Sequence, residues 1–199
     1  MLQSHDANKG INDKYDGINQ PLINDILINQ DQLIGSVCHR VFEYVIKNNG
    51  KYDDLNVFLN YLFHHYGVSQ SLQANIEKCA TDAIENTLAK FPWLFQSKNS
   101  RCEQAMIMLS KSELQTRTPD LIIYREAKYE IVDYKFISPA SGQSLERFFA
   151  ENTKRYQQQL QHYQKLLALA EGIDFENIET YLYFPLIAEL RCLSRTDSA

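Results

Sequence analysis

The first half of the chain has apolar residues at helical spacing. From Leu33 onward they fall three and four residues apart, until a glycine at position 50 provides a stop. Ser69 is a candidate N-cap for a later helical stretch, and Pro92 interrupts the pattern. The expected helices span residues 33–48, 53–65 and 69–90.

After residue 100 the pattern changes to short apolar runs rich in Ile, Val and Tyr, which are typical of β-strands. A long helix is expected afterwards, ending at Gly172, then a final strand and a short edge strand after Leu186. The central strands are apolar on both faces, which implies helices packed on each side. We therefore predict an α/β or α+β fold with a mixed central sheet. The expected segments are strands 103–109, 119–124, 129–136 and 178–185, loop 138–142 and helix 145–170.

The segment "TPDLIIYREAKYEIVDYKF" is a candidate β-hairpin with a polar connection. Symmetric closure pairs Arg125 with Lys128. The same register sets Asp120 opposite Asp133, where like charges repel unless a cation binds between them. Lys135 lies two residues beyond Asp133, so strand alternation puts it on the same face. Two carboxylates and an ammonium at one place indicate a metal-dependent centre that cleaves phosphodiesters.

Composition and charge add three expectations. The 199 residues include 44% hydrophobic ones, a globular value, and no apolar run or signal-peptide core is present, so we expect a cytoplasmic protein without a membrane partner. The four cysteines are scattered without a C-x-x-C pair, which favours reduced thiols. The net charge of −5 is unusual for a DNA-binding protein. Either a local basic patch or another domain or subunit must then deliver the nucleic acid.

Three motifs occur in a fixed order between Gly35 and Tyr163. "GSVCHRVFEYV" has a Gly, a His four residues later and then a Glu. "TPDLIIY…YEIVDYKF" is the hairpin, and "RYQQQLQHY" has a Tyr, a Gln three residues on and a Tyr four further. Together they resemble the PD-(D/E)XK nuclease superfamily, in its RecB-like branch, the nuclease domain of bacterial helicase–nucleases. The resemblance implies a restriction-endonuclease-like core.

The resemblance also implies roles for named residues. Asp120, Asp133 and the backbone carbonyl of Tyr134 would bind Mg²⁺ or Mn²⁺, and His39 would add a nitrogen ligand from the first helix. Lys135 would orient or help deprotonate the attacking water and offset charge in the transition state.

Other residues are expected near the site. In the family, the helix face that carries Tyr156, Gln159 and Tyr163 borders the metal and contacts the strand. Glu43, one turn after the histidine, is a candidate to orient the imidazole, or else an exposed charge. Glu103 opens the first expected strand. Whether its carboxylate approaches the metal or not is left open, with equal weight on the two alternatives.

The chain departs from the family pattern at two places. Arg117-Thr118-Pro119 stands where a Gly is common, and Phe136 stands where a Thr is usual. The cysteines lack the spacing that some relatives use for an iron–sulfur cluster, so none is expected. No phosphate-binding G-x-x-x-x-G-K-[ST] loop is present either.

These observations lead to a functional hypothesis. We expect a metal-dependent DNA exonuclease of repair or recombination, acting alone or with a helicase domain or subunit. The alternatives are a catalytically inactive nuclease-like module that binds DNA or a partner, and an endonuclease on the same fold. Residues 1–20 are expected to be a flexible lead-in or linker. Residues 21–199 would form one nuclease domain, with a helical part at 21–95 and a sheet-bearing core at 100–199.

Overall fold

The computed structural model describes residues 30–110 and 113–193, with side chains except at 108–115. The expected lead-in at 1–20 lies outside the described residues. The chain divides into two units, 1–33 and 34–199, and the architecture below is that of the second. None of the described helices is long and apolar enough to cross a membrane.

The helices expected in the first half are confirmed. Gly50 follows the first of them with a φ of 84°, a conformation that glycine adopts without strain. Ser69 is the N-cap residue of the third, although its side chain makes no capping hydrogen bond. The helices are α2 (Gln30–Lys47), α3 (Leu55–His65), α4 (Gln70–Lys90) and a short α5 (Trp93–Gln96).

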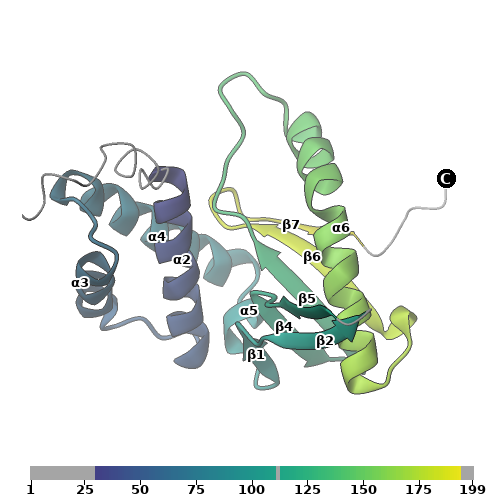
Figure 1. The fold of residues 1–199 in the computed structure, drawn as a ribbon. Coiled ribbons are helices and arrows are strands. Elements are labelled where there is room, and N and C mark those ends of the chain that lie inside the picture. Colours follow the sequence, from purple (N-terminus) through teal and green to yellow (C-terminus); the bar gives the residue numbers. More distant parts are fainter. Residues whose placement is uncertain (1–29, 111–112, 194–199) are drawn as a thin grey trace, which may run out of the picture. The chain divides into compact units, whose positions relative to one another are not determined.

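A five-stranded mixed sheet forms the centre of the structure, as predicted (Figure 1). Its order is β1-β4-β5-β6-β7; β5 and β6 are parallel, and the other neighbours are antiparallel. The hairpin register is also confirmed, since Arg125 pairs with Lys128 and the ladder runs on to Leu121 and Val132. The strands are β1 (Ser100–Cys102), β4 (Leu121–Arg125), β5 (Lys128–Tyr134), β6 (Ile178–Phe184) and β7 (Glu189–Cys192).

The prediction of a single strand at residues 103–109 is wrong. The chain instead turns at Glu103, whose φ is 49°, and this turn separates β1 from β2 (Met106–Ser110). Strand β2 pairs with β3 (Glu113–Arg117) in a separate two-stranded sheet that we did not predict. The prediction that β5 ends at Phe136 is also wrong, since the strand ends at Tyr134. Beyond it the Ile137 N–H donates to the Lys135 carbonyl at 2.8 Å, and this hydrogen bond turns the chain.

Helix α6 (Leu145–Glu171) crosses one face of the sheet (Figure 1). The Ser144 side chain caps its N-terminus, and Gly172, at a φ of 66°, ends it as predicted. A short 3₁₀ helix, η2 (Phe175–Asn177), leads into β6. The core on this side combines residues of α6 with those of β2, β4, β5 and β6: Met106, Ile122, Ile131, Phe148, Leu160, Tyr163, Leu166, Leu167, Ala168, Ile178, Leu182 and Phe184.

Helices α2, α4 and α5 cover the opposite face. Phe42 of α2 contacts the Phe95 ring of α5 and the Tyr134 ring of β5, at centroid distances of 4.9 and 5.1 Å. The buried Thr87 of α4 hydrogen-bonds to the Tyr183 hydroxyl of β6 at 2.7 Å. Helices therefore pack on both faces, as the apolar strands indicated. The end of the hairpin near the β4–β5 connection is not covered in this way, since Tyr124 is 44% exposed.

Candidate metal centre

Three side chains from separate segments form a group of potential metal ligands. His39 comes from α2, Glu103 from the turn after β1, and Asp120 from the residue before β4. Each offers one ligand atom, and these atoms all lie within 4.8 Å of one another. Carboxylate oxygens suit Mg²⁺, and the added imidazole suits Mn²⁺ better. This donor set fits a divalent cation.

The turn that carries Glu103 is held against the hairpin by its backbone. The Glu103 N–H donates to the Asp120 carbonyl at 3.1 Å. The backbone of Glu103 has a left-handed conformation, which ends the extended strand β1 at the preceding residue. The Glu103 carboxylate therefore does not follow the alternation of side chains along β1, and it lies close to the ligand atoms of His39 and Asp120. Burial and the charge of Asp120 raise the pKa of Glu103, which is the expected effect of placing two acids together without a cation.

Asp120 joins two elements through its two oxygens. Its Oδ2 accepts the Tyr134 N–H of β5 at 2.6 Å, while its Oδ1 lies 3.3 Å from Nδ1 of His39. Burial alone would lower the pKa of His39, but the hydrogen bond to Asp120 and the neighbouring negative charges outweigh it, so that pKa is raised. A cation at this place would therefore compete with a proton on the imidazole.

Asp133 lies beside this group and is almost completely buried, with 2% of its side chain exposed. Its Oδ2 forms an ion pair with the Lys135 ammonium, and its Oδ1 accepts the Gln159 amide of α6 at 3.1 Å. Burial, and next the charge of Asp120, raise the pKa of Asp133 to about 6, although Lys135 opposes this change. A buried carboxylate of this kind gains from a nearby cation.

A polar chain from α6 fixes the position of Asp133. The Gln159 amide also donates to the Tyr163 hydroxyl at 2.7 Å, and that hydroxyl donates to the Thr118 carbonyl at 3.3 Å. Burial raises the pKa of Tyr163 to about 12, so its hydroxyl stays protonated as a donor. The helix therefore holds both the strand that carries Asp133 and the segment that precedes Asp120.

Lys135 has a second partner in Tyr156. The Lys135 Nζ lies 4.3 Å from the centre of the Tyr156 ring, within the range of a cation–π interaction. The neighbouring Arg155 guanidinium lies 5.3 Å from the same ring. The ring and the Asp133 carboxylate together restrict where the ammonium can lie.

The structure brings most of the predicted site residues together: His39, Asp120, Asp133, Lys135, Tyr156, Gln159 and Tyr163 form one connected set, and Glu103 joins it. Glu43 differs. Its carboxylate is partly buried and pairs with Arg40 at 2.7 Å and with Lys47 at 2.6 Å, so in the described contacts these two cations, and not the imidazole, are its partners. The backbone carbonyl of Tyr134 remains a predicted ligand.

The Phe136 side chain packs beside the candidate site. Its ring lies 5.2 Å from the His39 imidazole and 5.0 Å from the Phe42 ring, both edge-on. Sequence reasoning did not find this contact or that of the Thr118 carbonyl. The spacing of three between His39 and Phe42, which places both on one face of α2, was the available signal for Phe42 near the site.

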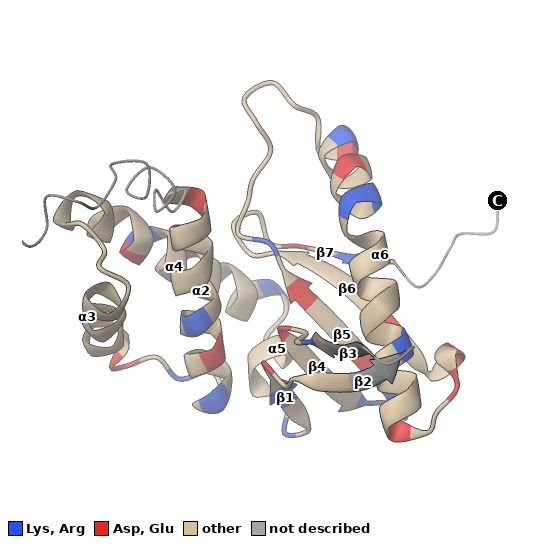
Figure 2. Cartoon of the chain, in the orientation of Figure 1, with Lys and Arg blue, Asp and Glu red and all other residues tan. Residues whose placement is uncertain are grey.

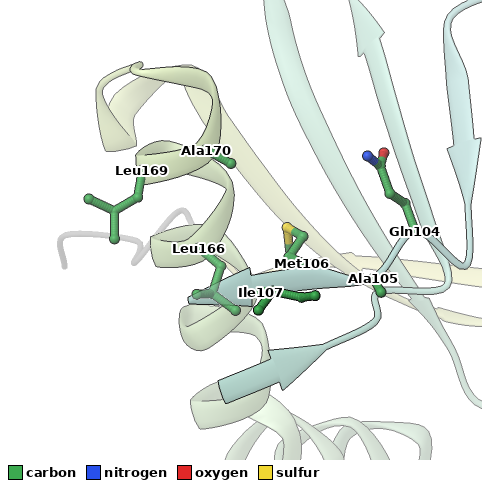
Figure 3. Close-up of a pocket in the computed structure, with 7 residues that line it drawn as sticks. All are labelled: Gln104, Ala105, Met106, Ile107, Leu166, Leu169 and Ala170. Atoms are coloured by element: carbon green, nitrogen blue, oxygen red, sulfur yellow. The ribbon is translucent and has the colours of Figure 1, made fainter. Parts of the chain in front are cut away.

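The segment after Glu103 borders a hollow of about 290 Å³ against α6 (Figure 3). No charged side chain lines it, so it offers no acid or base to the candidate metal centre. Its lining residues are Gln104, Ala105, Met106, Ile107, Leu166, Leu169 and Ala170.

Comparison with known proteins assigns no family to the chain. Neither a protein-family model nor a curated protein sequence matches it. The resemblance to RecB-like nucleases therefore rests on the three sequence motifs, and any function drawn from it is a proposal.

Proposed function

We propose that this chain is a Mg²⁺- or Mn²⁺-dependent deoxyribonuclease, a RecB-like exonuclease with a restriction-endonuclease-like core. The observation that carries the proposal is the donor group of His39, Glu103 and Asp120 beside the ion pair of Asp133 and Lys135. These residues come from segments far apart in the sequence, yet they meet at one end of the central hairpin. Acids, an imidazole and an ammonium at one place suit the hydrolysis of a phosphodiester.

His39, Glu103, Asp120 and Asp133 would hold the cation, with the Tyr134 carbonyl as a further ligand. The bound metal would lower the pKa of a water molecule and polarise a phosphoryl oxygen. Asp120 is prepared for this task, because the Tyr134 N–H fixes one of its oxygens and leaves the other facing the imidazole.

Lys135 would supply positive charge where the scissile phosphate gains negative charge. Its side chain is 17% exposed, so part of it can be reached by a substrate from solvent. Its contacts with Asp133 and the Tyr156 ring hold it in place before the substrate binds. Little reorganisation is then needed during the reaction, which is the condition for effective electrostatic stabilisation.

DNA is the proposed substrate, and repair or recombination the proposed context. Basic and acidic side chains alternate on α2 and on the N-terminal part of α6 (Figure 2), so no single-sign surface on these helices would capture a duplex by charge alone. This pattern agrees with a helicase domain or subunit that delivers the strand.

The experiment is a cleavage assay on single- and double-stranded DNA with Mg²⁺, Mn²⁺ or a chelator. We expect metal-dependent products from the wild type and none from Asp133→Ala. Asp82→Ala is the matched control, since Asp82 is a half-exposed aspartate on α4 paired only with Lys78 at 2.6 Å in the described contacts. Equal background from wild type and Asp133→Ala would overturn the proposal. Closed circular DNA left intact would identify an exonuclease, and nicked circles an endonuclease.

The second candidate is a nuclease-like module that only binds DNA or a partner. The observation that favours it is Phe136, whose ring packs against the His39 imidazole where the family has a small polar residue. Calorimetric titration with Mn²⁺ separates the two. A nuclease requires a site that is lost in both Asp120→Ala and Asp133→Ala, whereas a binding module has no such site.

A further inference from the structure

A row of aromatic rings lies on α2 and α3, outside the metal centre. Tyr44 of α2 stacks on Phe58 of α3 with centroids 4.4 Å apart and planes 18° apart. The row continues along α3, from Phe58 to Tyr61 at 6.2 Å and 20°, and from Tyr61 to His65 at 5.9 Å and 16°. Four rings from two helices therefore form a row in which each ring plane lies within 20° of the next.

The outer part of this row is not used to build the core. Helix α3 buries Leu55, Leu59, Leu62 and Phe63, which occupy its other side. Tyr61 is 61% exposed, a high value for so large a ring. The helix contains no acidic residue between Leu55 and His65, so its exposed rings are not shielded from an anionic partner.

The exposed face of α2 connects the row to the metal centre. Tyr44 lies five residues after His39, which corresponds to about 140° around the helix and about 7.5 Å along it. Arg40 and Lys47 project into the sector between them. They share one carboxylate, that of Glu43, so this sector keeps a net positive charge.

Arg40 also lies near the end of α3. The Tyr66 side chain, at the C-cap of that helix, is one of the groups that raise the pKa of Arg40, and the Tyr66 ring contacts the His65 ring edge-on at 5.0 Å. The cation on α2 therefore lies near the end of the aromatic row.

We infer that Tyr44, Phe58, Tyr61 and His65 form a stacking platform for the bases of single-stranded DNA whose backbone crosses α2 at Arg40 and Lys47. The inference rests on the proposed function, since it supplies the substrate class and the place where the strand lies. Every base has a π-face, so stacking on rings tolerates any sequence, as an exonuclease requires. Paired bases in a duplex do not expose these faces, so the platform selects single strands.

The first test measures binding of a fluorescent dT oligonucleotide to the full chain in a chelator, where no cleavage takes place. We expect Tyr61→Ala together with His65→Ala to weaken binding about ten-fold or more. Tyr61→Phe keeps the ring and should bind within about two-fold of the wild type. Val57→Ala is the matched control, because Val57 is 72% exposed on the same helix and has no ring.

A spectroscopic test reports stacking itself. The chain has one tryptophan, Trp93, so Tyr61→Trp in a Trp93→Phe background places a single indole in the row. The dT oligonucleotide should quench its fluorescence, and a duplex of equal length should quench it far less. A Val57→Trp variant in the same background should respond weakly.

The outcomes separate this inference from the nuclease proposal. Cleavage that needs Asp133, with an oligonucleotide affinity indifferent to Tyr61 and His65, overturns the platform and leaves the nuclease standing. Binding that depends on the rings without any cleavage leaves the platform and removes the nuclease. Equal quenching by duplex and single strand, or no DNA binding at all, overturns the platform and points to a protein partner for these rings.

Discussion

At the scale of single residues, the geometry favours one of the two alternatives for Glu103, an approach to the candidate metal group. Its left-handed φ and the hydrogen bond from its N–H to the Asp120 carbonyl bring a second carboxylate to the group of His39, Glu103 and Asp120. The carboxylate lies in a half-buried place where its pKa is raised by burial and by Asp120. It therefore carries an energetic cost that a bound cation would remove.

Replacement of Glu103 tests this reading. We expect Glu103→Gln to weaken Mn²⁺ binding about ten-fold or more, since an amide oxygen replaces a charged ligand, while the thermal unfolding temperature of the metal-free protein stays the same or rises. Calorimetric titration gives the affinity. Glu43→Gln is the control, because Glu43 pairs with Arg40 and Lys47 and should leave the affinity unchanged. Equal effects of the two changes would exclude Glu103 from the site.

Tyr156 provides a second residue-scale prediction. If its ring positions the Lys135 ammonium, Tyr156→Phe should keep most of the cleavage rate, while Tyr156→Leu should lower it about five-fold or more with little change in Mn²⁺ affinity. Single-turnover cleavage and Mn²⁺ titration of both variants are the measurements. A Phe variant as slow as the Leu variant would show that the hydroxyl matters and not the ring.

Much of the candidate site could be predicted from sequence, because its motifs fix local spacing. Asp133 and Lys135 share a strand face by alternation, and Gln159 and Tyr163 share a helix face by their spacing of four. The turn at Glu103 could not be predicted, because it is held by the contact of its N–H with the Asp120 carbonyl, which forms only when separate elements pack. The ion pairs of Glu43 with Arg40 and Lys47 are local to α2, at spacings of three and four residues, and could have been predicted.

At the scale of elements, the helices and the hairpin register follow from local patterns. Symmetric closure of the β4–β5 connection determines every pair in that ladder, so one turn predicts the whole register. The β2–β3 pair was missed, because its strand signal merges with that of β1 across Glu103. Periodicity alone does not reveal a backbone turn between two β segments.

The connection between β4 and β5 gives the element-scale prediction. Its two residues, Glu126 and Ala127, have φ values of 52° and 61°, the pattern of a type I′ turn, which Asn-Gly adopts with least strain. We expect Glu126→Asn with Ala127→Gly to raise the free energy of unfolding by about 1 kcal/mol. Chemical denaturation measures it.

The control for the turn is Glu126→Gln. This change removes the weak ion pair with Arg125, at 3.7 Å and with Glu126 84% exposed, and leaves the backbone preference nearly as it was. It should alter stability by less than about 0.5 kcal/mol. If the Asn-Gly variant is less stable than the wild type, the turn is not of this type.

At the scale of the whole molecule, the fold places charged groups where the apolar layers meet. The sheet is covered by α6 on one face and by α2, α4 and α5 on the other, and the candidate metal centre lies where α2, α6 and the hairpin converge. Asp133 is buried there at a cost to folding. The molecule therefore gives up stability to keep a carboxylate that the proposed reaction needs.

The variant Asp133→Asn tests whether burial of the Asp133 carboxylate lowers the stability of the fold. The pKa of Asp133 is about 6 in the folded protein against an ordinary 3.8, so the native state favours the protonated form. Wild-type stability should fall as pH rises through this interval, and the variant should lack that fall. In metal-free buffer at pH 8 the variant should be more stable, by about 1–3 kcal/mol, and the gain should vanish near pH 4. Mn²⁺ should then stabilise the wild type but not the variant, while Asp82→Asn should behave as wild type. A variant less stable at pH 8 would mean that the ion pair with Lys135 outweighs the cost of burial.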